Sequence, residues 1–120
     1  MKIIVTGGTG YIGSHTVVEL QKNGFEVVIA DNLSRSDSKV INAIKLITGV
    51  LPTLEEIDLN EEAKIDALFK KHPGIKGIIH FAAFKAMNES VNRPIAYYRN
   101  NLCSLMNVLE AMQKNKVRDI

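Results

Sequence analysis

The sequence contains a single cysteine, Cys103, and no tryptophan. One cysteine cannot close an internal disulfide, and without a cysteine pair or Cys/His ligand spacing no metal site is indicated. Cys103 falls inside a helical pattern and is interpreted as a small packing residue. The 120 residues are enough for one domain with an ordinary hydrophobic core.

Dense blocks of one charge and long apolar runs are also missing. The formal net charge is +2, and without a cluster of Lys and Arg we expect no nucleic-acid partner. No apolar run approaches the roughly 18 residues of a membrane-spanning helix, and the N-terminus does not have the pattern of a signal peptide. We therefore expect no membrane partner and a cytoplasmic location.

Glycine, in contrast, is concentrated in the stretch Thr6–Gly13, which reads TGGTGYIG. This stretch follows an apolar run expected to form a strand and precedes a helical pattern, which is the setting of a dinucleotide-binding turn. In such a turn Gly7 permits the tight bend, Gly10 lets a pyrophosphate approach the backbone, and Gly13 lets the helix pack closely. The N–H groups of the first helical turn would then face the phosphates. A glycine-rich turn without a ligand is the alternative.

Asp31 ends the second expected strand, eighteen positions after Gly13. A carboxylate about 20 residues beyond the glycines typically accepts hydrogen bonds from the adenosine ribose hydroxyls. It would repel a 2′-phosphate, so the site is predicted to prefer NAD to NADP, although the nearby Arg35 weakens that preference. The alternative is that Asp31 only caps a helix or a turn.

Further polar residues lie at or after the later expected strands. Asp58 could accept the amino protons of adenine, or it could cap the next helix, for which Asn60 is another candidate. His80 lies within the fourth strand and is interpreted as a hydrogen-bonded core residue. Lys85 follows that strand in a stretch of small and apolar residues, and at the switch point of the sheet it would face the ribose or the nicotinamide. A solvent-exposed surface lysine is the alternative.

Alternating strand and helix patterns predict an α/β fold with a parallel, Rossmann-type sheet and helices on both faces. Strands are expected near residues 2–6, 26–31, 53–58 and 76–81, in the order 3-2-1-4. A final helix is expected from Pro94 to about Lys114. Its predicted apolar face consists of Tyr98, Leu102, Leu105, Leu109 and Met112. Residues 116–120 have the pattern of the start of a fifth strand.

The most specific patterns lie in five segments, Thr6–His15, Asp31–Leu33, His80–Ala86, Glu89–Ser90 and Tyr97–Asn101. Together they resemble the UDP-glucose 4-epimerases of the extended short-chain dehydrogenase/reductase family. The glycine spacing alone is typical of enzymes that act on nucleotide sugars. The segment around Lys85 and the Tyr-Tyr-x-Asn-Asn helix are what indicate the epimerases.

The resemblance implies NAD as a tightly bound cofactor, and UDP-glucose and UDP-galactose as substrates. In that chemistry NAD oxidises the sugar C4 hydroxyl, the 4-keto sugar turns over in the site, and hydride returns to its other face. The step requires a Tyr base activated by a Lys, usually as Y-x-x-x-K, and a Ser or Thr. Tyr11, Tyr97 and Tyr98 each lack a lysine at the fourth following position. No catalytic residue is therefore assigned to this chain.

In that family the missing catalytic residues follow strand five, beyond the position of Ile120, as does the substrate domain. Residues 1–120 are accordingly interpreted as a partial NAD-binding Rossmann domain, truncated before strand five, from a homodimeric enzyme, and this chain alone is expected to be inactive. A non-catalytic dinucleotide-binding module and the start of a nucleotide-sugar 4,6-dehydratase are the alternatives. The predicted cofactor contacts are Gly7, Gly10, Tyr11, Ile12, Gly13, Asp31, Asn32, Asp58, Leu59, Phe81, Ala82, Lys85 and Asn100.

Overall fold

A parallel sheet forms the centre of the computed structural model, which describes residues 1–33, 37–82 and 91–120. Its strands are β1 (Lys2–Thr6), β2 (Glu26–Asp31), β3 (Thr53–Glu56) and β4 (Ile75–His80), in the order β3-β2-β1-β4. Each neighbouring pair is parallel. The predicted fold class and strand order are confirmed, and β1 and β2 have the predicted bounds.

The other two strands differ slightly from the prediction. β4 begins and ends one residue early, and β3 ends at Glu56 instead of residue 58. Past Glu56 the backbone makes one more bond to β2, from the Ile57 N–H to the Asp31 carbonyl at 3.1 Å. It then turns, because the Asp58 carboxylate accepts the Asn60 N–H at 2.9 Å. Asp58 therefore lies in a turn beyond the strand.

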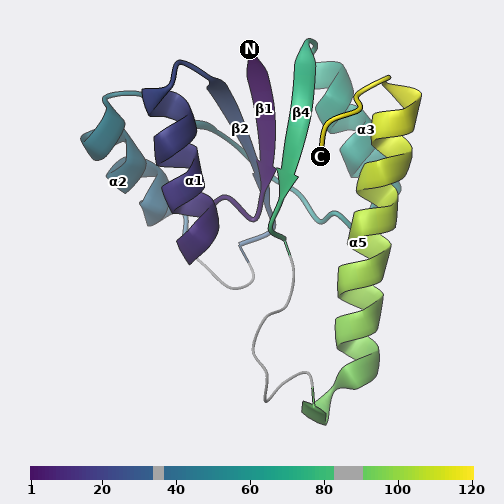
Figure 1. Cartoon of the computed structure of the whole chain (residues 1–120). Helices are drawn as coiled ribbons and strands as arrows, with labels where there is room; N and C mark the ends of the chain where they lie inside the picture. The colour runs from purple at the N-terminus through teal and green to yellow at the C-terminus, as the bar shows by residue number, and fades with distance from the viewer. Residues whose placement is uncertain (34–36, 83–90) are drawn as a thin grey trace.

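Helices cover both faces of the sheet, as Figure 1 shows. α1 (Tyr11–Lys22) and α2 (Lys39–Thr48) lie on one face, and α3 (Glu62–Lys71) and α5 (Pro94–Lys114) lie on the other. Successive strand residues point to opposite faces, so each helical layer has its own core. Ile4 and Val28 belong to the core beneath α3 and α5, whereas Val5 and Ile29 belong to the core beneath α1 and α2.

α5 has the predicted bounds but buries a different face. Its buried residues are Tyr97, Ser104, Val108, Ala111 and Met112. The prediction was wrong for Tyr98, Leu102 and Leu109, which are exposed. The buried face combines large side chains, Tyr97 and Met112, with smaller ones, and the other apolar side chains of α5 point outward.

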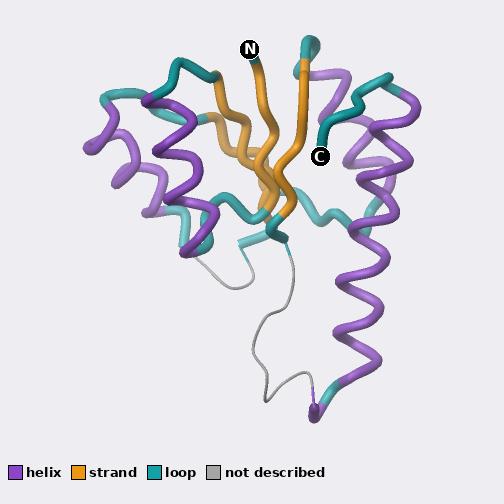
Figure 2. The backbone as a smooth tube through the Cα atoms, in the orientation of Figure 1, coloured by secondary structure: helices purple, strands orange, loops and turns teal. Residues whose placement is uncertain are grey.

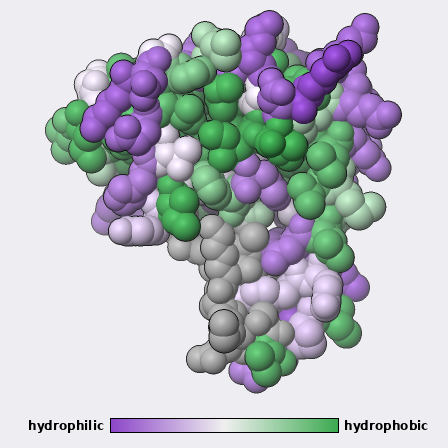
Figure 3. All heavy atoms as spheres, viewed as in Figure 1, coloured by the Kyte–Doolittle hydropathy of each residue, from purple (hydrophilic) through white to green (hydrophobic). Residues whose placement is uncertain are grey.

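The N-terminal half of α5 extends well past the carboxyl ends of the strands, as Figure 2 shows. The segment after α5 returns to the sheet, where the Ile78 N–H donates to the Asp119 carbonyl at 2.9 Å and an isolated parallel bridge joins Gly77 to Asp119. The fifth strand expected over residues 116–120 is present only as this bridge. Apolar residues gather between the two helical layers in Figure 3, where Figure 1 places β4.

Candidate nucleotide-binding site

The glycine loop lies at the carboxyl ends of β1 and β2 (Figure 1). The Gly7 N–H donates to the Ala30 carbonyl at 2.9 Å, which ties the loop to β2. Gly7 has a φ of 69°, which residues other than glycine rarely adopt. A Cβ there would lie 2.8 Å from the Ala82 nitrogen. Glycine is therefore required where the loop passes between β2 and the residues after β4.

The start of α1 packs directly onto this loop. A Cβ on Gly13 would lie 2.1 Å from the Gly7 carbonyl oxygen, so only glycine fits there. Gly10 is the N-cap and provides no side-chain hydrogen bond. Because the first N–H groups of a helix have no intrahelical partner, those of α1 can bind an anion. The side chains of Tyr11 and Ile12 are 82% and 53% exposed, so they flank this position.

Asp31 lies against the glycine loop from the neighbouring strand. Its Oδ2 accepts the Thr9 hydroxyl at 2.5 Å and the Thr9 N–H at 3.3 Å. Its Oδ1 accepts the N–H of Leu33 at 2.8 Å, and Leu33 has a φ of 59°. That conformation costs a non-glycine residue about 1–2 kcal/mol, which the hydrogen bond partly offsets. Asp31 thus stabilises a turn, as the alternative interpretation held, and it also presents a half-buried carboxylate beside the loop.

Thr6 joins the carboxyl ends of β1 and β4. Its hydroxyl accepts the N–H groups of Phe81 and Ala82 at 3.1 and 3.3 Å and lies 2.7 Å from His80 Nδ1. Because the two N–H groups already occupy both acceptor positions of the hydroxyl, we assign its proton to the bond with Nδ1, which puts the proton of a neutral His80 on Nε2. Burial lowers the pKa of His80, which favours this neutral form. His80 is hydrogen-bonded as predicted, although it is half-buried rather than fully buried.

The turn between β3 and α3 brings Asp58 and Leu59 to the same end of the sheet. Leu59 is 6% exposed and belongs to the core beneath α3 and α5, so only its backbone remains for a ligand. Neither Asp58 nor Asn60 caps α3, because the N-cap is Glu61, which makes no side-chain cap bond. The Asn60 side chain instead donates from Nδ2 to Oδ1 of Asn100 on α5, at 3.2 Å.

The structure places the predicted contacts in two groups. The glycine loop, Asp31 and the pair Phe81–Ala82 form one group around β1, linked by the bonds described above. Asp58 and Asn100 form a second group, joined through Asn60. Asn32 is exposed next to Asp31. Lys85 and Arg35 lie outside the described residues, so their predicted roles stay predictions.

Three residues of the site were missed by sequence reasoning. Thr6 and Thr9 belong to the glycine motif, and their hydroxyls in a buried turn were a usable signal. Asn60 was considered only as a helix cap, and its side-chain partner lies 40 residues further along the chain. No local pattern could have found that contact.

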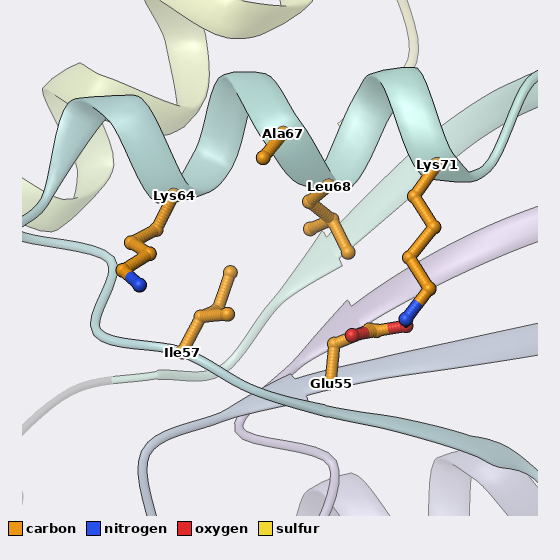
Figure 4. A pocket seen from close by; sticks show the side chains of 6 residues that line it. All are labelled: Glu55, Ile57, Lys64, Ala67, Leu68 and Lys71. Carbon is orange, nitrogen blue, oxygen red and sulfur yellow. The ribbon is translucent and has the colours of Figure 1, made fainter.

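A separate hollow lies between β3 and α3 (Figure 4). It is lined by Glu55, Ile57, Lys64, Ala67, Leu68 and Lys71. Lys71 Nζ lies 2.9 Å and His72 Nε2 2.8 Å from Glu55 Oε1. The hydrogen bond from Lys71 is the main cause that lowers the pKa of Glu55, and burial opposes it. These contacts attach the end of α3 to β3, and we interpret them as structural.

The strand order, the glycine loop at a strand-to-helix turn and the carboxylate at the end of β2 are the features of a Rossmann-type dinucleotide-binding domain. The comparison with protein families is more specific. The chain belongs to the NAD dependent epimerase/dehydratase family, whose model matches residues 3–120.

Several relatives carry the same name. The UDP-glucose 4-epimerase of Bacillus subtilis (strain 168) is 48% identical over 120 residues, which are 100% of this chain and 35% of that protein. The UDP-glucose 4-epimerase of Klebsiella pneumoniae is 42% identical over 119 residues, covering 99% of this chain and 85% of that sequence. The crystal structure of UDP-glucose 4-epimerase from Bifidobacterium longum in complex with NAD+ and UDP matches with a TM-score of 0.95 and 37% identity. That match covers 98% of this chain and 35% of the solved one.

The chain spans about a third of the length of most of these relatives, for example 35% of the Yersinia pestis and Bacillus subtilis enzymes. Within residues 1–33, 37–82 and 91–120, each helix is too short or too polar to cross a membrane.

Proposed function

We propose that this chain forms the NAD-binding part of a UDP-glucose 4-epimerase, which interconverts UDP-glucose and UDP-galactose. The contact between Thr9 and Asp31 carries the proposal. It puts a carboxylate suited to ribose hydroxyls beside a helix N-terminus suited to a pyrophosphate. The names of the relatives support an epimerase over a 4,6-dehydratase, and the NAD+ and UDP of the Bifidobacterium longum complex support the cofactor and the substrate class.

The described residues fit a bound NAD at the glycine loop. Gly7 and Gly13 let the loop and the first turn of α1 pack closely, because a Cβ on either would meet backbone atoms, and Gly10 adds no competing cap. The phosphates would accept hydrogen bonds from the first-turn N–H groups of α1 near Tyr11 and Ile12. This arrangement holds the middle of the cofactor by backbone groups.

The two ends of the cofactor would be held by side chains. Within the described part of the chain, three donors bind the roughly four acceptor positions of the Asp31 carboxylate, which leaves Oδ1 able to accept a ribose hydroxyl. We place adenine near Asp58 and the backbone of Leu59. The nicotinamide end would lie toward Phe81, Ala82 and Asn100. Asn32 and Lys85 complete the contacts that we propose.

NAD, when bound, supplies the hydride acceptor and then the hydride donor for the sugar carbon. The residues of this chain bind and orient it, and they keep side chains out of the phosphate position. A base must take the proton of the C4 hydroxyl, and none of the three tyrosines has a lysine four positions later. We therefore propose that residues 1–120 are a partial NAD-binding domain that is inactive alone.

The outward face of α5 supports a homodimer. The bulky apolar residues at helical spacing on that face are Ile95, Tyr98, Leu102, Met106 and Leu109, all exposed. A stripe with spacings of three and four residues can pair with the same stripe of a second copy about a two-fold axis. The cytoplasmic location expected from the sequence stays a prediction.

Calorimetric titration of the purified chain with NAD tests the binding assignment. We expect saturable binding of NAD. Asp31→Ala should weaken this binding at least about tenfold, because it removes one strong hydrogen bond to a charged group. A chain that does not bind NAD would contradict the proposal. Formation of UDP-glucose from UDP-galactose by the purified 120 residues would contradict the absence of a catalytic base.

A further inference from the structure

We propose that Asn60 is a positioning residue that orients two candidate cofactor contacts, Asp58 and Asn100. The inference rests on the proposed NAD-binding function. The Asn60 N–H donates to Oδ1 of Asp58 at 2.9 Å, and its side-chain Nδ2 donates to Oδ1 of Asn100 at 3.2 Å. One residue is thus bonded to both members of the second group of the site, through its backbone and through its side chain.

The carboxamide of Asn100 is held at both ends. Its Oδ1 accepts the bond from Asn60, and its Nδ2 donates to Oδ1 of Asn101 at 3.0 Å. These two bonds hold the plane of the Asn100 amide between its neighbours. A side-chain amide has two N–H groups and two acceptor positions, so one of each remains available to a ligand in a defined direction.

The backbone bond acts on Asp58 in a similar way. Because Oδ1 of Asp58 accepts the Asn60 N–H inside the turn, Oδ2 is left to accept a hydrogen bond from a ligand. Asn60 therefore sets the orientation of both groups before a ligand arrives, and preorganised groups bind with a smaller ordering cost.

The other end of the Asn60 side chain shows that stability alone does not explain an asparagine here. Its Oδ1 is buried and has no hydrogen-bond partner among the residues that the structure describes. A buried acceptor without a partner destabilises a fold, and an apolar side chain of similar shape avoids that cost. Such a local conflict is typical of positions selected for function.

Asn107, on the same helix as Asn100, provides a matched control for Asn60. Its Nδ2 donates to the carbonyl of Leu59 at 2.9 Å, so it attaches α5 to the same turn. Its other bond is to Sγ of Cys103. It therefore contributes the attachment without bonding to Asp58 or Asn100.

Two variants of the full chain, Asn60→Leu and Asn107→Leu, distinguish the positioning of Asn100 from the attachment of α5 to the β3–α3 turn. Asn60→Leu should weaken NAD binding roughly tenfold, because it frees the Asn100 amide, while its Tm stays near that of the wild type. Asn107→Leu leaves the Leu59 carbonyl unpaired, so its Tm should fall further. Its NAD affinity should fall less than that of Asn60→Leu, because the bonds to Asp58 and Asn100 are kept. Calorimetry and thermal unfolding measure both quantities.

Two further measurements test whether Asn60 affects NAD binding through its bond to Asn100. In an Asn100→Ala background the effect of Asn60→Leu on NAD affinity should disappear, because the group that it positions is gone. Without any cofactor, the side-chain amide signals of Asn100 in an NMR spectrum should move in Asn60→Leu and stay in place in Asn107→Leu.

Wild-type affinity in Asn60→Leu would overturn the inference while leaving the proposed function intact. The inference would also be overturned if both variants lose NAD affinity in proportion to their loss of Tm. It would likewise fail if the Asn60→Leu effect persists in the Asn100→Ala background, or if the Asn100 amide signals do not move in Asn60→Leu. A wild-type chain that fails to bind NAD would contradict the proposed function itself, and the inference with it.

Discussion

The two groups of the candidate site are built from different kinds of contact. Around β1 the glycine loop meets Asp31 through a backbone N–H and a hydroxyl of Thr9, 22 residues away. The Thr6 hydroxyl joins it to the backbone of Phe81 and Ala82, 75 and 76 residues away. Between the β3–α3 turn and α5 the contacts are side-chain amides whose partners lie 40 and 48 residues apart. In the first group Gly7 and Gly13 have no room for a side chain, whereas every contact of the second group depends on a side chain that can be replaced. We expect the first to resist change and the second to be adjustable.

Gly13→Ala should have the largest effect, because its Cβ would lie 2.1 Å from a backbone oxygen that cannot move away freely. We expect a loss of about 3 kcal/mol or more in the free energy of unfolding, at the upper end for overpacked sites. Urea unfolding followed by circular dichroism measures this loss.

Gly10→Ala is the control for that variant. Its Cβ would meet only the Gly7 carbonyl oxygen at 3.3 Å, and its φ of −74° suits alanine. Its stability should fall by about 1 kcal/mol or less, while NAD affinity falls because the new methyl group occupies the phosphate position. Equal stability losses in the two variants would contradict a loop fixed by sterics at Gly13.

Two methionines on α5 test which face of that helix is structural. Met112 is 4% exposed and Met106 is 59% exposed. Met112→Ala should cost about 2–4 kcal/mol of stability, whereas Met106→Ala should stay within about 0.5 kcal/mol. Met106→Ala should instead weaken self-association in light scattering over a concentration series. If Met106→Ala is the more destabilising variant, the assignment of the two faces is wrong.

Asp31→Ala tests the contact that joins β2 to the glycine loop. Removing the carboxylate should cost about 1.5–3 kcal/mol of NAD binding free energy and should narrow the gap between NAD and NADP, since the repulsion of a 2′-phosphate is lost. Thr9→Val is the control, because it keeps the carboxylate but removes the hydroxyl that orients it. An unchanged ratio of NAD to NADP affinity in Asp31→Ala would mean that Asp31 only stabilises its turn.

The smallest predicted effect is a dependence of stability on pH at His80. Burial lowers its folded-state pKa below the ordinary 6.5, so the unfolded chain takes up a proton first as the pH falls. His80 therefore contributes stability that is present above pH 6.5 and is lost as the pH falls through the lower folded-state pKa. Urea midpoints at pH values on either side of this range should differ less in His80→Asn than in the wild type. Identical pH dependence in both proteins would contradict a half-buried histidine that the fold keeps neutral.

The features that the sequence predicted correctly are those that depend on local patterns, and the features that it missed depend on contacts between distant residues. The bounds of β1 and β2, the start of α5 at Pro94 and the glycine loop depend on local patterns, and each was predicted correctly. α5 has two apolar stripes, and local periodicity favoured the bulkier one. In the folded chain the buried stripe is instead the one with Tyr97, Ser104, Val108, Ala111 and Met112. That choice depends on tertiary contacts.

Within the candidate site, the placement of the glycine loop beside Asp31 was predictable and the amide contacts were not. The glycines and Asp31 have fixed spacing because a strand-to-helix turn and the next strand impose it. Asp58 was expected in a strand but lies in a turn, because its own side chain accepts the Asn60 N–H. The pairing of Asn60 with Asn100 requires α5 to return to the β3–α3 turn, which only the folded chain reveals.

We propose that this chain binds NAD mainly through the phosphate and adenosine groups of the cofactor. Calorimetry of the purified chain with NAD, ADP-ribose and NADP tests it most directly. We predict that ADP-ribose binds within about tenfold of NAD, and that NADP binds at least about tenfold more weakly because of Asp31. NAD binding a hundredfold or more tighter than ADP-ribose, or NADP binding as tightly as NAD, would contradict the account.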